Sequence, residues 1–222
     1  IYVYIHYDNI IKLIGGINMK IITLTGASAS GKDLLLKEVV KDNSNIKPIV
    51  SVTTRPKREG EEDGVDYKFI SFEEFKELFE NDGLIERREY HTVDGIWHYG
   101  VAKDSIDLES TDSYIVILDV YGVIQLTKYL SELETDTPIE VYPIFINCNG
   151  QQRLLRSLHR ESNLKDTQVA EICRRYLDDQ EQVVMHKDLF DIILKNENQQ
   201  DIERCKSIIK GLVDNTETIK KG

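Results

Sequence analysis

Residues 26–32 of the chain read Gly-Ala-Ser-Ala-Ser-Gly-Lys, which fits the pattern G-x-x-x-x-G-K. The apolar, β-branched segment Lys20–Thr25 precedes this run, and Asp33–Lys41 follows it with leucine and valine at helical spacing. Between a strand and a helix, small residues let backbone N–H groups converge on phosphate oxygens, and the helix N-terminus adds positive potential. We therefore predict a phosphate-binding loop made of Gly26, Ala27, Ser28, Ala29, Ser30, Gly31 and Lys32. Lys32 would supply a mobile positive charge to the terminal phosphates.

Two carboxylates are candidates for holding a metal ion beside this loop. Asp33 occupies the position at which the pattern has a Ser or Thr that coordinates Mg²⁺, and carboxylates are also good ligands for hard cations. Asp119 ends the continuous apolar run Ser113–Asp119, which predicts a strand buried on both faces. We predict that Asp33 and Asp119 hold Mg²⁺, directly or through a water. The alternative for Asp33 is that it only stabilises the first helical turn.

Predicted strands and helices alternate along most of the chain after residue 19. Further strands are expected at Pro48–Val52, Tyr67–Ser71, Leu84–Tyr90, Ile139–Ile146 and Phe190–Leu194. Further helices are expected at Phe72–Asn81, Gly122–Leu133, Gln151–Arg160, Gln168–Val184 and Asp201–Val213. Such alternation is typical of an α/β fold in which helices cover both faces of a mostly parallel sheet. Residues 53–100 interrupt the pattern because they are charged, turn-rich and strand-rich, so we expect an insertion with its own small sheet.

The first eighteen residues differ from the rest. A secretory signal would begin with basic residues and end at a small-residue cleavage site, and Ile1–Asn18 has neither. We expect residues 1–18 to be a non-native extension, Met19 to be the natural start, and residues 19–222 to form one domain. The alternative is a real N-terminal strand, for which Tyr2–Ile5 has a suitable composition.

The charge balance and the cysteines exclude several classes of function. The chain has 28 Lys and Arg against 39 Asp and Glu, a net charge of −11, which argues against binding to nucleic acid or to an anionic membrane surface. No apolar run reaches the roughly 18 residues of a membrane span. The three cysteines lie far apart with no Cys-x-x-Cys pair, which favours a reducing compartment and a cytoplasmic location.

Two arginines stand out in this acidic chain. Arg55 and Arg58 lie near hydroxyl-bearing residues, and paired guanidinium groups match the oxygens of a phosphate monoester. With Ser51 and Tyr67, they form the pattern S-x-T-T-R-x-x-R…G-x-x-Y, which resembles the acceptor-binding segment of the guanylate kinase family. The resemblance continues through Leu84-Ile85-Glu86, the Tyr99-Gly100 turn, Arg153–Arg160 and Ile172–Arg175, and it covers about residues 20–212.

The resemblance implies a three-layer P-loop kinase. Its core would comprise residues 19–52, 101–150 and 184–214, with a small β-rich acceptor-binding region at 53–100 and a helical lid at 151–183. It implies ATP-dependent phosphorylation of a nucleoside monophosphate, GMP or dGMP, with Mg²⁺ bound alongside ATP. The implied GMP-binding residues are Ser51, Arg55, Arg58, Tyr67, Glu86 and Tyr99. Glu86 would accept hydrogen bonds from the ring N–H and the amino group of guanine.

The lid is expected to carry three arginines on one helix face, since Arg153, Arg156 and Arg160 are spaced at i, i+3 and i+7. By resemblance, Arg156 and Arg160 would clamp the ATP phosphates. Arg175 would bridge donor and acceptor, with Arg174 as the competing candidate. Asn196 resembles an asparagine that lies near the adenine of ATP. The implied catalytic residues are therefore Lys32, Arg58, Arg156, Arg160 and Arg175.

The chain departs from the family pattern at two places. Val101 stands where the family has a Ser or Thr that helps to read the base, and Val120-Tyr121-Gly122 is shorter than the family segment and lacks its second aspartate. Glu86 would then read the base nearly alone. One alternative is an enzyme like ribose 1,5-bisphosphate phosphokinase, which the combination of Asp33 with Tyr99-Gly100-Val101 resembles. Another is a catalytically silent binding module. The expected assembly is a monomer or a homodimer.

Overall fold

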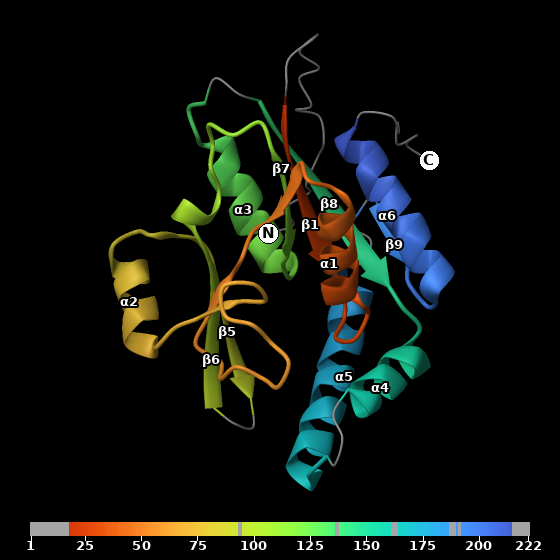
Figure 1. The fold of residues 1–222 in the computed structure, drawn as a ribbon. Helices are drawn as coiled ribbons and strands as arrows, with labels where there is room; N and C mark the ends of the chain where they lie inside the picture. Colours follow the sequence, from red (N-terminus) through yellow and green to blue (C-terminus); the bar gives the residue numbers. More distant parts are fainter. Residues whose placement is uncertain are drawn as a thin grey trace.

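A central five-stranded sheet organises the computed structural model of this chain (Figure 1). In spatial order its strands are β2 (Ile46–Pro48), β7 (Ser113–Ile117), β1 (Met19–Thr25), β8 (Ile139–Asn147) and β9 (Ile192–Lys195), and all four neighbouring pairs are parallel. The structure describes residues 18–92, 95–135, 138–160, 164–186, 190 and 192–214, so the predicted extension lies outside it except for Asn18. The predicted α/β fold with a mostly parallel sheet is confirmed.

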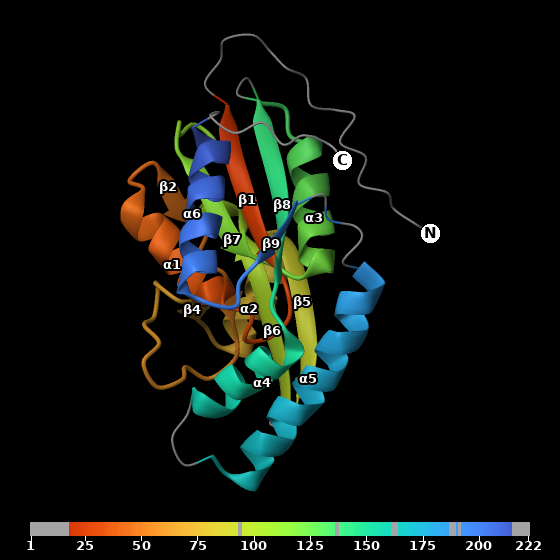
Figure 2. The same ribbon diagram turned by 90° about the vertical axis from the view of Figure 1, so that its right-hand side faces the viewer.

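Helices cover both faces of this sheet (Figure 2). Successive β1 side chains point to opposite faces. Ile22 and Leu24 pack in a core with residues of α1 (Lys32–Asp42) and α6 (Gln199–Val213). Met19 and Ile21 pack in a second core with residues of α3 (Val120–Ser131). This two-sided burial explains why β1 carries apolar residues on both of its faces.

Residues 53–100, the segment expected to be an insertion, contribute most of a second, four-stranded sheet, which lies below the central sheet in the view of Figure 1. Its spatial order is β4 (Lys68–Phe69), β3 (Val52–Thr53), β6 (Gly95–Ala102) and β5 (Leu84–Thr92), and α2 (Phe72–Glu80) begins with a capping box formed by Ser71 and Glu74. An ion pair of 2.6 Å between Lys37 of α1 and Asp66 ties this region to the core.

Two expectations about this region were wrong. Tyr99-Gly100 is not a turn, because both residues lie inside β6 and pair with β3 on one side and β5 on the other. The single strand expected at Pro48–Val52 is split, with Pro48 ending β2 in the central sheet and Val52 beginning β3 in the small one. The residue pattern of such a short apolar run does not show that the chain leaves one sheet and enters another within it.

The predicted lid consists of α4 (Gly150–His159) and α5 (Asp166–His186), which contact each other below the central sheet (Figure 1). In α4, Arg153 is buried whereas Leu155 is exposed, the reverse of the usual arrangement on a helix. The buried face of α4 therefore brings positive charge to the phosphate-binding loop, and that charge needs a partner.

Candidate active site

The loop between β1 and α1 has the backbone shape that its glycines predict. Gly31 caps α1 with a φ of +92°, a conformation that other residues rarely adopt. A Cβ atom on Gly31 would lie 2.4 Å from the amide nitrogen of Asn196. That amide is itself fixed, because Asn196 is buried and donates a hydrogen bond of 2.9 Å to the carbonyl of Ser30. Asn196 thus supports the loop from behind, and its contact with adenine stays a prediction.

Lys32 folds back onto its own loop. Its ammonium group donates hydrogen bonds to the carbonyls of Gly26 at 2.7 Å and Ala27 at 2.9 Å. Burial lowers the pKa of Lys32, whereas the nearby carboxylates of Asp33 and Asp179 act in the opposite direction. A phosphate that enters the loop would give this partly buried cation a full negative charge as its partner, in place of the partial charges of the two carbonyls.

Two cavities meet where the loop faces the lid. The first, of about 320 Å³, is lined by arginines from three segments: Arg55, Arg58, Arg153, Arg160 and Arg175. The second, of about 650 Å³, is lined by the loop with Lys32, by Tyr67 and Tyr99, and by Asp119. Both cavities include Ser28, Arg175 and Asp179 in their walls, so they are contiguous at the loop. Of the implied catalytic residues, only Arg156 lines neither.

The lid arginines differ in what they contact. Arg156 donates to the carbonyl of Ala29 in the loop at 3.4 Å and to those of Asn196 at 3.2 Å and Glu197 at 3.0 Å, so it links the loop to the segment after β9. Arg175 donates to Glu171 at 2.9 Å and lines both cavities, whereas its competitor Arg174 pairs with Glu171 and Asp178 and lines only the second. The geometry favours Arg175 over Arg174 as the residue between two substrates.

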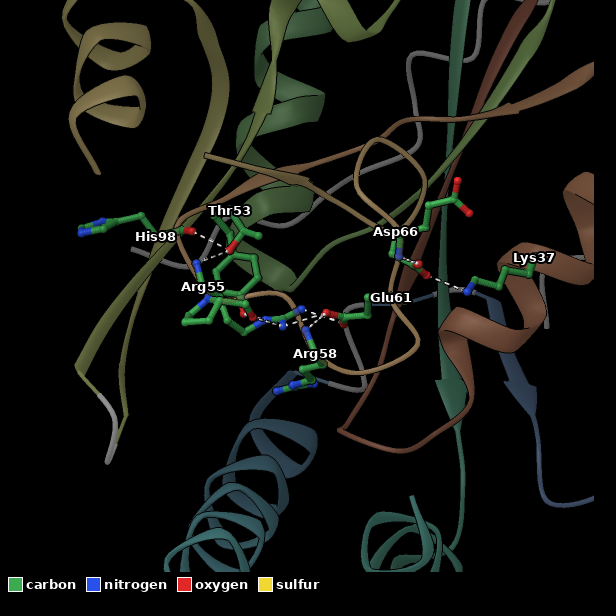
Figure 3. Close-up of polar contacts among 10 residues, drawn as sticks. Lys37, Thr53, Arg55, Arg58, Glu61, Asp66 and His98 are labelled. Atoms are coloured by element: carbon green, nitrogen blue, oxygen red, sulfur yellow. Dashed lines mark hydrogen bonds and ion pairs between the residues drawn. The ribbon is translucent and has the colours of Figure 1, made fainter. Parts of the chain in front are cut away.

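The implied acceptor-phosphate site already contains a carboxylate. Glu61 accepts hydrogen bonds from both terminal nitrogens of buried Arg55, at 2.9 and 2.8 Å, and from the backbone N–H of Arg58 (Figure 3). The Nε of Arg55 donates to the hydroxyl of Tyr99 at 3.2 Å. Figure 3 shows the Arg58 side chain pointing away from this pair, toward α5. Within the described residues no carboxylate is found paired with the Arg58 guanidinium, so this group is open to a phosphate.

Burial shifts the pKa values of two groups in this site. Burial lowers the pKa of Arg58, and the neighbouring cations Arg55 and Arg175 lower it further. Burial also raises the pKa of Tyr67 to about 12, with Asp33 adding to the effect, so the hydroxyl stays protonated at neutral pH. The Arg58 guanidinium and the protonated Tyr67 hydroxyl can both donate hydrogen bonds to a dianionic phosphate.

The implied base-reading residue, Glu86, does not face either cavity. It is buried, and Arg88 holds both of its oxygens, with Nε to Oε2 at 2.9 Å and Nη2 to Oε1 at 3.0 Å. Burial raises the pKa of Glu86, and the attraction to Arg88 opposes that rise. Ser51, another implied GMP ligand, is also buried and lines neither cavity.

Sequence reasoning missed three residues of the site: Glu61, Arg88 and Asp179. Arg88 had a weak signal, because it follows Glu86 by two positions and residues at that spacing share one face of a strand. Glu61 and Asp179 had none. Each is one acidic residue among 39 in this chain, and only packing brings it to Arg55 or to the loop.

The carboxylates near the loop suit a cation that arrives with a nucleotide. Asp119 caps α3 through a 2.8 Å hydrogen bond from the Gly122 N–H and also accepts a hydrogen bond of 2.6 Å from the Tyr90 hydroxyl. Each carboxylate oxygen can accept more than one hydrogen bond, so Asp119 still has lone pairs that can bind a cation or a water in the cavity. Asp33 is exposed in the first turn of α1. Mg²⁺ typically uses one or two carboxylates together with waters and phosphates, and Asp119, in the wall of the larger cavity, can be one of them, whereas Asp33 lines neither cavity.

None of the helices in the described part of the chain combines the length and the apolarity that a membrane span requires.

Comparison with known proteins gives a consistent result. The family model described as guanylate kinase matches residues 18–213. Among curated relatives, the guanylate kinase of Thermotoga maritima is 32% identical over 195 residues, covering 86% of each chain. That of Neisseria meningitidis serogroup A is 30% identical over 196 residues, covering 87% of this chain and 86% of the relative. The solved guanylate kinase of Anaplasma phagocytophilum has a similar fold, with a TM-score of 0.62 at 24% identity, covering 91% of this chain and 87% of that one.

Proposed function

The chain belongs to the guanylate kinase family, and we infer that it is a nucleoside monophosphate kinase that transfers a phosphoryl group from ATP to GMP, giving GDP. The family match covers most of the chain, and the relatives are matched over most of their own length. The residues that perform each step are our proposal.

The observation that carries this proposal is the pair of contiguous cavities. One contains the phosphate-binding loop, and the other is lined by arginines from the acceptor region and the lid. Transfer between two bound phosphates requires that they meet end to end with their charges neutralised. Ser28 and Arg175 lie in both walls, so the point of transfer is next to them.

We assign the roles as follows. The loop backbone and Lys32 bind the donor phosphates, and Arg58 binds the acceptor phosphate. Arg175, which lines both cavities, and Arg160, which lines the first, balance the charge that spreads over the transferred group. Arg156 links the loop to the segment after β9, because it donates to the carbonyl of Ala29 and to those of Asn196 and Glu197. The acceptor phosphate is largely ionised at neutral pH, so no strong general base is required. Closure of the lid over the cavities excludes water that would otherwise hydrolyse ATP.

Mg²⁺ is the proposed partner of ATP, held through Asp119 and Asp33. When bound, it neutralises phosphate charge and helps to align the donor. The side chains contribute independently of it, since Asp119 fixes the start of α3 through Gly122, and Lys32 stays within the loop.

The test is an ATP-consumption assay with Mg²⁺ and a panel of acceptors: GMP, dGMP, AMP, UMP and ribose 1,5-bisphosphate. We expect turnover with GMP or dGMP far above that with the others. Preferred turnover of ribose 1,5-bisphosphate would instead identify a sugar-phosphate kinase. Absence of turnover with every acceptor, in a protein that still binds GMP, would identify a silent binding module.

The working unit and the location are also proposals. We propose that the chain works as a monomer or as a homodimer. The three cysteines are free thiols, and Cys148 and Cys205 are buried, which supports a reducing compartment such as the cytoplasm.

A further inference from the structure

We propose that Tyr90 is a positioning residue that holds the carboxylate of Asp119 from the acceptor-binding region, and that it thereby links the binding of GMP to the binding of ATP with its metal ion. The inference rests on the proposed function, since it concerns how the two substrate sites of that reaction are connected.

The first argument is the contact itself. Tyr90 lies in β5, and its hydroxyl donates a hydrogen bond of 2.6 Å to Oδ2 of Asp119. The other oxygen of this carboxylate, Oδ1, accepts from the backbone N–H of Gly122 at 2.8 Å. The carboxylate is therefore held through both of its oxygens, by the first turn of α3 on one side and by the small sheet on the other. Two such contacts fix the orientation in which its remaining lone pairs are offered to a ligand.

The second argument is where the contact lies. Tyr90, Asp119 and Lys32 all line the larger cavity, so the hydrogen bond is in the same wall as the phosphate-binding loop. Hydrogen-bond partners of a metal-binding carboxylate orient it, and their loss typically weakens metal binding by about 10- to 100-fold. Tyr90 is placed to do this for Asp119, the carboxylate that we assign to the Mg²⁺ of ATP.

The third argument is a series of contacts from Tyr90 to the acceptor-phosphate site. The ring of Tyr90 packs edge-on against the ring of Tyr99, with 5.4 Å between the ring centroids and 86° between the planes. The Tyr99 hydroxyl accepts the 3.2 Å hydrogen bond from Nε of Arg55, an implied ligand of the acceptor phosphate. A phosphate that fixes Arg55 and Tyr99 would also restrict the Tyr90 ring, and through its hydroxyl the carboxylate of Asp119.

A separate polar contact keeps β5 against α3. The side-chain amide of Gln125, in α3, accepts a hydrogen bond of 3.4 Å from the backbone N–H of Arg87 and donates one of 3.3 Å to the carbonyl of the same residue. This contact uses only the backbone of β5, so it does not depend on the Tyr90 hydroxyl. Removal of that hydroxyl is therefore expected to leave the strand in place and to release only the carboxylate.

The test compares the unaltered protein with Tyr90→Phe, which keeps the ring that packs against Tyr99. Calorimetry measures the Kd for the non-hydrolysable β,γ-imido analogue of ATP, once with Mg²⁺ and once with EDTA. We expect the Kd with Mg²⁺ to be about 10-fold higher in Tyr90→Phe, while the Kd in EDTA stays unchanged. An unchanged Kd with Mg²⁺ would refute the positioning role. Equal increases under both conditions would also refute it, because the hydroxyl would then act on the nucleotide and not on the metal-binding carboxylate.

The matched control is Tyr142→Phe. The Tyr142 hydroxyl also donates to a carboxylate, that of Glu140 at 2.7 Å, but neither residue lines either cavity. Both Kd values of this control should equal those of the unaltered protein.

A double variant shows whether Tyr90 acts through Asp119. In an Asp119→Asn protein, the further change Tyr90→Phe should leave the Kd with Mg²⁺ where it is, because two residues that act as one unit do not have additive effects. A further increase of about 10-fold in the double variant would show that the hydroxyl acts through another group, which would overturn the proposal.

The link between the two sites has its own readout. The Kd for GMP is measured alone and in the presence of the ATP analogue with Mg²⁺. We expect the analogue to lower the Kd for GMP in the unaltered protein and to lower it less in Tyr90→Phe, since coupling between two bound ligands is reciprocal. The same decrease in both proteins would show that the coupling does not pass through Tyr90.

Failure of this inference can be told apart from failure of the proposed function. Turnover of GMP by the unaltered protein tests the function alone, and its absence would mean that the function itself is wrong. If GMP is phosphorylated but Tyr90→Phe binds both nucleotides as the unaltered protein does, only the role of Tyr90 is lost.

Discussion

The carboxylate of Asp179, in the lid helix α5, accepts a hydrogen bond of 2.8 Å from the backbone N–H of Ser28 in the phosphate-binding loop. The same oxygen lies 3.5 Å from a guanidinium nitrogen of Arg153. An acidic side chain of the lid therefore uses a backbone donor that the loop otherwise offers to a phosphate oxygen. The loop and the lid are held together by a contact that a nucleotide has to replace.

The Asp179–Ser28 contact predicts competition with ATP. Asp179→Asn keeps the size of the side chain but removes its charge, so we expect the KM for ATP to fall by about 3- to 10-fold, since a neutral acceptor makes a hydrogen bond weaker by about 1 kcal/mol than a charged one. The control is Asp178→Asn, one residue earlier, which pairs with Arg174 and not with the loop. A KM for ATP that stays constant or rises in Asp179→Asn would contradict this expectation.

Lys32 is predicted to be essential for turnover but not for folding. Its ammonium group contacts only its own loop, so Lys32→Ala should lower kcat by at least about 100-fold. The melting temperature should stay close to that of the unaltered protein. Lys41→Ala, at the exposed end of the same helix, should have normal activity. Near-normal turnover by Lys32→Ala would remove Lys32 from the catalytic site.

Glu61 is predicted to stabilise the acceptor region in a pH-dependent way. Burial alone would raise the pKa of Glu61, but the hydrogen bonds from Arg55 and Arg58 outweigh it and hold the pKa below its usual 4.5. The unfolded chain then takes up the proton first as the pH falls, so the stabilisation is complete above the unfolded value and is lost as the pH falls through the folded one.

Urea unfolding can measure this contribution. At pH 7, Glu61→Gln should lower the free energy of unfolding by about 1–3 kcal/mol, because the buried Arg55 loses its charged partner. The difference between the two proteins should shrink at a pH well below 4.5. Glu59→Gln, at an exposed position two residues earlier, should change neither value. A difference that is independent of pH would show that Arg55 does not depend on the charge of Glu61.

Gly31 is predicted to be intolerant of any side chain. Gly31→Ala would combine a left-handed backbone with a Cβ 2.4 Å from the Asn196 amide, so we expect destabilisation by more than about 2 kcal/mol and weaker ATP binding. Gly60→Ala separates the two effects, since Gly60 has a φ of +79° but open space for 4 Å around the position that a methyl group would take. That control should lose only about 1 kcal/mol. Equal losses in the two variants would show that contact with Asn196 is unimportant.

Most of the fold could be predicted from local patterns. The phosphate-binding loop, the alternation of strands and helices, and the separate small sheet all depend on the spacing of glycines and apolar residues, which the chain carries within short segments. Where prediction failed, at Tyr99-Gly100 and at Pro48–Val52, the outcome depended on which distant strand provided the hydrogen bonds. Local propensity carries no information about that choice.

The sequence by itself determined the type of chemistry. A phosphate-binding loop and a pair of arginines near hydroxyl groups can each be recognised from residues that lie close together in the chain. The tertiary structure alone decided which charged groups are free. Glu61 pairs with Arg55, six residues away, and Arg88 pairs with Glu86, two residues away. Asp179 accepts a hydrogen bond from Ser28, which is 151 residues away. In a chain with 39 acidic residues, the partner of a buried arginine is set by packing, since a buried charge must be paired by whichever carboxylate the fold brings within reach.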